Sequence, residues 1–186
     1  MKSTQIKLFR LVSDRTEHGG EVAKGKRKVS RPIRAKQIAH VVLRSKKAKG
    51  ELNFLRPKHA ARIERILRAQ ANKHIVKLHE YVNVGNHLHL KLRPFCKKGF
   101  QNFLRSSAAL IARAVTGAKK GKPFGAFWDG LAYSRVLKTR AEEWILRRYF
   151  IANSYEAEFG RMARDTYLSE TPLKRRIGWR IERMTT

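Results

Sequence analysis

Two histidines separated by one residue are the part of this sequence that most directly suggests chemistry. The stretch His87-Leu-His-Leu-Lys-Leu92 alternates polar and apolar residues, which is typical of a β-strand with one buried face. On such a strand the imidazoles of His87 and His89 leave the same face, with their Cβ atoms roughly 7 Å apart. Two imidazoles in that arrangement can share one divalent metal ion. The alternative is that both are ordinary polar residues on a solvated sheet face.

A tyrosine and an asparagine form a second candidate pair further along the chain. Tyr149 and Asn153 are four residues apart in a segment with helical spacing, so they share one helix face. A tyrosine oxygen can act as a nucleophile and form a covalent intermediate, and the carbonyl oxygen of an asparagine can complete a metal shell. Arg147 and Arg148 flank the tyrosine and could hold a phosphate. The alternative is an amphipathic core helix in which Tyr149 only packs.

The charge of the chain indicates what the partner is. The 186 residues include 43 Lys and Arg against 14 Asp and Glu, a formal net charge of +29. Such a chain repels itself, so we expect an anionic partner. Nucleic acid is the first candidate because phosphate neutralisation supplies most non-specific affinity, and an anionic membrane surface is the second.

The remaining composition limits the setting. The single cysteine, Cys96, excludes an intrachain disulfide and a cysteine zinc cluster. No window approaches the ~20 apolar residues of a membrane span, so we expect neither a signal peptide nor a membrane helix. These features predict a cytoplasmic protein.

Together the two pairs suggest chemistry on a phosphodiester. A metal held by the histidines would polarise the phosphate as a Lewis acid and orient it. Tyr149 would attack in line, giving a phosphotyrosine and a free hydroxyl. That intermediate keeps the bond energy, so the same site could reseal the strand without ATP. We therefore expect an enzyme that cuts and rejoins DNA.

The elements that would position these residues can be read from periodicity and turn signals. Strands are predicted at 40–44, 75–82 and 87–92, with one or two more within 127–137. Helices are predicted at about 57–72, at 98–116, and from Arg140 past Asn153. Thr139 and Glu142 form a capping-box signature at the start of the last helix. The order β, α, β, β, α, β, α predicts an α+β fold with helices packed on an antiparallel sheet.

Two motifs resemble a known group of enzymes. The stretch Val84-Gly-Asn-His-Leu-His-Leu90 resembles the His-hydrophobic-His signature of HUH endonucleases. Tyr149-Phe-Ile-Ala-Asn153 resembles the tyrosine helix of the single-tyrosine transposases, and Phe127-Trp128-Asp129 before the last strand is also similar to the family. The chain is most similar to the REP-associated tyrosine transposases and the small insertion-sequence transposases. The resemblance covers about His40 to Glu158.

The resemblance implies a specific site and substrate. It implies a ferredoxin-like or RRM-like HUH fold, with His87, His89 and Asn153 as ligands of Mg²⁺ or Mn²⁺. Tyr149 would be the nucleophile and would leave a 5′-phosphotyrosine and a free 3′-OH. The substrate would be single-stranded DNA next to an imperfect hairpin. Some members of the family act as dimers and others as monomers, so a homodimer is left open.

These expectations divide the chain into three parts. Residues 1–36 would form a basic arm, with 14–36 as a loose segment. Residues 37–159 would form the HUH single-tyrosine nuclease domain, and residues 160–186 a basic tail. Lysines and arginines expected to touch DNA are Lys24, Lys26, Arg27 and Lys28 in the arm, and Lys119, Lys120 and Lys122 in the loop after the second helix.

Other interpretations remain open. A non-catalytic basic nucleic-acid-binding protein would explain the charge equally well. A relative of the replication initiators or relaxases would use the same chemistry, but only one tyrosine is in register here. Tyr155 is a rival nucleophile, although six residues from Tyr149 it points well away from that helix face.

Overall fold

The computed structural model describes residues 16–23, 25 and 29–170. Their elements follow in the order β1 (Glu17–His18), η1 (Gly20–Ala23), β2 (Ala39–Arg44), η2 (Gly50–Leu52), α1 (Pro57–Lys73), β3 (Val76–Asn83), β4 (His87–Pro94), α2 (Lys97–Thr116), β5 (Tyr133–Val136), α3 (Arg140–Phe159) and α4 (Arg161–Glu170). None of these helices is both long enough and apolar enough to span a bilayer.

The strands form one antiparallel sheet in the order β1-β5-β2-β4-β3. The hairpin β3–β4 turns at Gly85, whose φ of 89° lies in the left-handed region that favours glycine. Strand β4 pairs with β3 on one side and with β2 on the other. In the β2–β4 pair, Val42 lies opposite His89 and Arg44 lies opposite His87. The predicted α+β class with an antiparallel sheet is confirmed.

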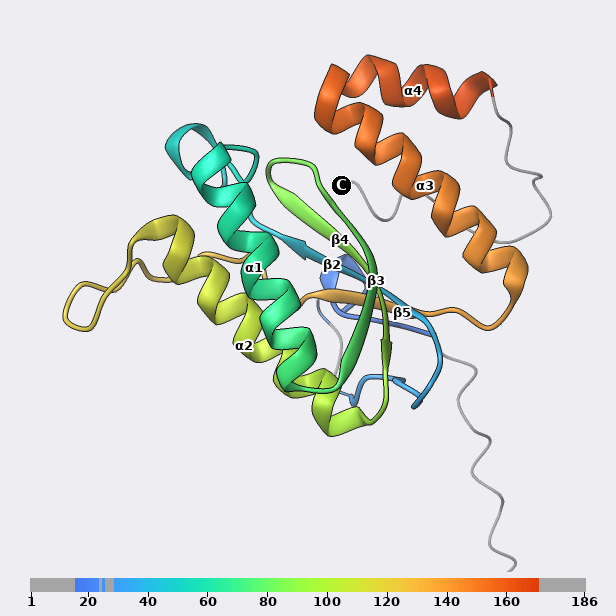
Figure 1. The fold of residues 1–186 in the computed structure, drawn as a ribbon, viewed down its shortest axis with the longest axis horizontal. Helices are drawn as coiled ribbons and strands as arrows, with labels where there is room; N and C mark the ends of the chain where they lie inside the picture. Colours follow the sequence, from blue (N-terminus) through green and yellow to red (C-terminus); the bar gives the residue numbers. More distant parts are fainter. Residues whose placement is uncertain (1–15, 24, 26–28, 171–186) are drawn as a thin grey trace, which may run out of the picture.

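Helices cover both faces of the sheet. Figure 1 shows α1 and α2 on one face and α3 with α4 on the other. Under α1 and α2 lies the main core, in which Leu88, Leu90 and Leu92 of β4 are fully buried. A smaller apolar cluster of Leu137, Leu146, Tyr149 and Phe150 lies between α3 and the other face. Strand β4 therefore contributes its leucines to the main core and its histidines to the face under α3.

Helix α3 starts where its capping residues predict. The Thr139 side chain accepts a hydrogen bond from Glu142 N at 3.2 Å, and Glu142 Oε2 accepts one from Thr139 N at 3.2 Å. Both bonds satisfy amide groups that the first helical turn leaves without an intrahelical partner. The helix runs past Asn153 to Phe159, so Tyr149 and Asn153 lie on adjacent turns of one rigid element.

The structure corrects two expectations about the ends of the domain. We expected 14–36 to be a loose basic segment, but Glu17–His18 forms strand β1 against β5, and the Arg135 guanidinium lies 2.8 Å from the Glu17 carboxylate. We also expected a tail from residue 160, but Arg161–Glu170 forms helix α4, which packs on α3. Of the one or two strands expected within 127–137, the structure has one, β5, of four residues.

Candidate active site

The two histidines of β4 are buried beneath α3. His87 is 9% exposed and His89 is fully buried, so neither is a polar residue on a solvated sheet face. Their ring centres lie 4.7 Å apart at nearly perpendicular planes. The alternation of β4 therefore places both imidazoles on one face, as predicted, and α3 closes that face from above.

Helix α3 brings the tyrosine to the histidine pair. The ring centre of Tyr149 lies 5.2 Å from that of His89, edge to face. Asn153 is fully buried one turn later, and its Nδ2 donates a hydrogen bond of 2.6 Å to the Tyr149 carbonyl oxygen. Because this bond holds Nδ2 against the helix backbone, the carboxamide oxygen, Oδ1, is turned away from that backbone. Two segments separated by about sixty residues in sequence therefore meet in one site.

Several buried polar atoms at this site have no hydrogen-bond partner. They are His87 Nε2, His89 Nε2, the Tyr149 hydroxyl and Asn153 Oδ1. Buried polar groups are almost always paired in folded proteins, so such a group of unpaired atoms is a sign of a ligand site. Two imidazole nitrogens and one carboxamide oxygen are a donor set that suits a divalent metal ion. The residues present therefore fit the metal that the sequence suggests.

Hydrogen bonds to the opposite ring nitrogens orient the two imidazoles. His87 Nδ1 lies 2.5 Å from Asn86 Oδ1, and His89 Nδ1 lies 3.1 Å from His40 Nε2. In both rings Nδ1 is thereby engaged and Nε2 is left available. The carboxamide oxygen of Asn86 can only accept, so it places the His87 proton on Nδ1, as the partners of metal-binding histidines do. Between His40 and His89 either ring can donate, so this bond orients the His89 ring. His40 itself is fully buried, against His89.

The electrostatic surroundings keep these imidazoles neutral. Burial lowers the pKa of His87 to about 4, with Arg44 and Arg164 contributing. Burial also holds the pKa of His89 well below its ordinary value, with further contributions from His87, His40 and Arg164. Neutral imidazole is the form that binds a metal.

An arginine of α4 is a site residue that the sequence did not reveal. Arg164 is 6% exposed, and its Cζ lies 5.9 Å from the centre of the Tyr149 ring. Its Nη1 lies 3.3 Å from Glu156 Oε2, which joins α4 to α3. Burial raises the pKa of Tyr149 to about 12, and the charge of Arg164 opposes that rise. Arg164 was missed because its segment was interpreted as a tail.

The cations expected to contact DNA are distributed unevenly. Arg147 is exposed, whereas Arg148 is buried with its guanidinium 4.9 Å from the Trp144 ring centre. Lys119, Lys120 and Lys122 are exposed on the loop that follows α2, which Figure 1 shows well apart from α3. Lys24, Lys26, Arg27 and Lys28 lie outside the described residues. Of the two arginines next to the tyrosine in sequence, Arg147 is therefore the one with an exposed charge.

The rival tyrosine does not enter the site. Tyr155 is 41% exposed, and its ring stacks on that of Tyr167 of α4 with centres 5.3 Å apart.

Within the described part of the chain, no group of three or more His, Cys, Asp and Glu side chains could hold a metal. The trio at this site differs because its third member is a carboxamide.

No family model matches the chain, and no curated protein matches it. A solved structure is similar with a TM-score of 0.45: a protein of Deinococcus radiodurans R1 provisionally assigned as a transposase. It shares 17% sequence identity over 69% of this chain and 98% of that one.

Proposed function

We propose that this protein is a metal-dependent endonuclease and strand transferase that acts on single-stranded DNA through Tyr149. The observation that supports this proposal most strongly is the meeting of β4 and α3. There the Tyr149 hydroxyl and the Nε2 atoms of His87 and His89 are all buried and all without partners. A packing role alone would leave those atoms unsatisfied, at a cost of about 1–3 kcal/mol each.

His87, His89 and Asn153 would hold the metal, Mg²⁺ or Mn²⁺. When bound, this ion would supply Lewis-acid polarisation of the scissile phosphate. Other groups of the chain hold these three ligands in position. Asn86 and His40 hold the two imidazoles in place through their Nδ1 atoms, and Asn153 is held by its bond to the α3 backbone.

Tyr149 would be the nucleophile. Its oxygen would form a bond to the 5′ phosphorus as the bond from that phosphorus to the 3′ oxygen breaks. The phenol loses its proton to solvent and the departing 3′ oxygen gains one, so the products are a 5′-phosphotyrosine and a free 3′-OH. Reversal with a second 3′-OH would join two strands. Arg164 would stabilise negative charge on the tyrosine oxygen, because its charge favours the phenolate.

Tyr149 is packed between α3 and the sheet, and Arg164 of α4 also lies against its ring. Tyr149 is 1% exposed, and Arg164 stands beside its ring. A DNA strand therefore reaches Tyr149 only after the packing around its ring has opened, for example by a movement of α4 away from α3. The Arg164–Glu156 ion pair is a contact that such a movement would break, and an incoming phosphate could replace Glu156 as the partner of Arg164.

The net charge of +29 supports nucleic acid as the substrate. Single-stranded DNA beside a hairpin, as in transposase-like members of the HUH group, is the substrate we propose. A replication initiator or relaxase would use the same tyrosine chemistry on a different DNA.

A labelled-oligonucleotide assay tests the proposal. Hairpin-tailed single-stranded DNA is incubated with the protein and Mn²⁺ and separated on a denaturing gel. We expect a 3′-labelled strand to migrate as a protein adduct, and a 5′-labelled strand to shorten and end in a 3′-OH that a polymerase extends. Tyr149→Phe should form no adduct, whereas the matched variant Tyr155→Phe should react normally. An adduct that persists in Tyr149→Phe would refute the assignment of the nucleophile.

The second candidate is a non-catalytic basic nucleic-acid-binding protein, which the charge alone favours. The double variant His87→Ala with His89→Ala separates the two. We expect it to lose cleavage while DNA binding is largely kept, since binding depends on phosphate contacts elsewhere. If the wild-type protein binds DNA but forms no adduct across a panel of hairpin-tailed strands with Mg²⁺ or Mn²⁺, the binding protein is the better description.

A further inference from the structure

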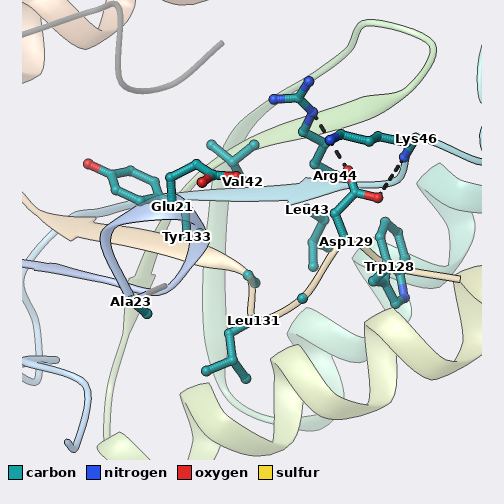
Figure 2. A pocket seen from close by; sticks show the side chains of 13 residues that line it. Glu21, Ala23, Val42, Leu43, Arg44, Lys46, Trp128, Asp129, Leu131 and Tyr133 are labelled. Carbon is teal, nitrogen blue, oxygen red and sulfur yellow. Dashed lines mark hydrogen bonds and ion pairs between the residues drawn. The ribbon is translucent and has the colours of Figure 1, made fainter. Parts of the chain in front are cut away.

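A cavity of about 410 Å³ lies beside the candidate active site. Its walls come from η1, from the end of β2, and from the segment between Trp128 and Tyr133, as Figure 2 shows. Neither the metal trio nor Tyr149 lines it, so the proposed cleavage chemistry leaves it without a role.

The pairing of β2 with β4 places this cavity next to the histidines. Val42 and Arg44 line the cavity, and they are the β2 residues opposite His89 and His87. Directly paired residues of an antiparallel sheet have their Cβ atoms about 4.5–5.5 Å apart. Tyr133, another lining residue, pairs with Val42 from the other side. The cavity is therefore about one strand spacing from the candidate metal ligands.

Hydrogen bonds hold the cavity walls in place. Asp129 accepts a bond of 2.8 Å from Lys46 N, and its other carboxylate oxygen lies 3.7 Å from Arg44 Nε, both drawn in Figure 2. Trp128 Nε1 donates to the Ala108 carbonyl at 3.0 Å, which ties this wall to α2. On the opposite side Gly20 N donates to the Leu131 carbonyl at 2.8 Å. The cavity is thus a built feature of the fold.

The lining combines apolar surface with charges of both signs at the rim. Val42, Leu131 and the ring of Tyr133 supply apolar walls, Arg44 and the exposed Lys46 carry positive charges, and Glu21 and Asp129 carry negative ones. Because Asp129 pairs with Arg44, an anion bound here would share Arg44 with that carboxylate and also meet Lys46. A flat apolar ring attached to an anion fits these walls and these two cations, and an unpaired nucleotide has that chemistry. Stacking of a base on protein rings and apolar side chains contributes to single-strand binding, and arginine adds to it.

We propose that this cavity binds one unpaired nucleotide of the DNA strand next to the scissile phosphate. The base occupies the space between Leu131 and Tyr133, and its phosphate lies against Arg44. The proposal rests on the proposed function for the identity of the strand, but the binding itself requires neither metal nor cleavage. One consequence is a sequence preference at a single position beside the cut.

The test uses the full chain carrying Tyr149→Phe, with a chelator present, so that neither metal nor covalent reaction contributes. Each of the four deoxynucleoside 5′-monophosphates is titrated in turn while methyl resonances of Val42, Leu131 and Ala23 are followed by NMR. Inorganic phosphate is titrated as a separate arm. We expect at least one nucleotide to shift these methyl resonances saturably, and inorganic phosphate to leave them unchanged. Equal shifts with phosphate, or no shift with any nucleotide, would overturn the proposal.

Two variants sharpen the result. Ala23→Trp places a bulky ring in the cavity and should weaken nucleotide binding at least tenfold. Ala69→Trp adds the same ring to the exposed surface of α1, which contributes no residue to the cavity lining, and should change nothing. Unaltered affinity in Ala23→Trp would count against the cavity as the site. If that variant fails to fold, the titration of the Tyr149→Phe protein still decides.

A cleavage experiment separates this inference from the proposed function. The otherwise wild-type protein and Ala23→Trp each act on a pool of hairpin-tailed strands with randomised flanks, and the cut products are sequenced. We expect Ala23→Trp to lose the bias at one position near the cut. Nucleotide binding without any cleavage would uphold the cavity and refute the nuclease. Cleavage with the same bias in both proteins would uphold the nuclease and refute the cavity as the nucleotide site.

Discussion

Replacing Arg164 by alanine should have opposite effects on the nucleophile and on the metal. The guanidinium carbon lies 5.9 Å from the Tyr149 ring centre. At an effective dielectric constant of about 20, two unit charges about 6 Å apart interact by about 3 kcal/mol. That energy corresponds to about two pKa units. Because the positive charge favours the phenolate, its removal should raise the pKa of Tyr149 further above about 12.

The pH dependence of adduct formation measures the effect on the nucleophile. A group with a raised pKa becomes deprotonated only at higher pH, so the rate should climb with pH in both proteins. At a given pH below that range, Arg164→Ala should form the adduct about 100-fold more slowly, which is two pKa units. Arg164→Lys keeps the charge and should recover part of the rate.

The same substitution, Arg164→Ala, should strengthen metal binding. Arg164 contributes to the lowered pKa of both His87 and His89, and the same repulsion acts on any cation bound between them. Half-saturation with Mn²⁺ should therefore need less metal in Arg164→Ala. The matched control is Arg161→Ala, a side chain 81% exposed on the same helix. If Arg164→Ala and Arg161→Ala share the wild-type pH profile and metal requirement, Arg164 has no electrostatic role at the site.

Three further results are expected. Burial raises the pKa of Glu142, but hydrogen bonds from Lys138 N, Arg135 and Thr139 N outweigh this and the net pKa is lowered. Its contribution to stability should thus be present above about pH 4.5 and be lost on further acidification, and Glu142→Gln should flatten that part of a plot of unfolding free energy against pH. Leu90→Ala should lower the unfolding free energy by about 2–5 kcal/mol in urea titrations, because it opens a cavity under α1 and α2; a cost below 1 kcal/mol would contradict its full burial. Replacing Lys119, Lys120 and Lys122 together by glutamine should reduce the slope of log affinity against log salt by about two for single-stranded DNA, at about 0.7 per phosphate contact; an unchanged slope would remove that loop from the DNA interface.

The parts of the fold that follow local rules could be predicted from the sequence. The alternation of β4 fixed which side chains share a face, and the capping box located the start of α3. Together these two features put Tyr149 and the histidines on surfaces that can meet. The contact itself depends on tertiary packing, and it appears only in the structure.

The parts that depend on packing were missed. Arg161–Glu170 carries few apolar residues and is stabilised as a helix by its packing on α3, so its pattern resembles a tail. Strand β1 is two residues long and exists only through pairing with β5. Arg164 could not be identified because nothing in the sequence shows that its segment turns back over Tyr149.

The two faces of β4 also govern how the protein can fail to fold. Side chains alternate with a period of two, so pairing β4 one residue out of step would exchange its faces. The leucines would then lie under α3, and the imidazoles would be forced into the apolar layer beneath α1 and α2. Burying unpaired imidazoles there would be costly. A chain that has found the correct strand alignment has therefore also placed both candidate histidine ligands on the face under α3, and a misaligned chain could not form the proposed site.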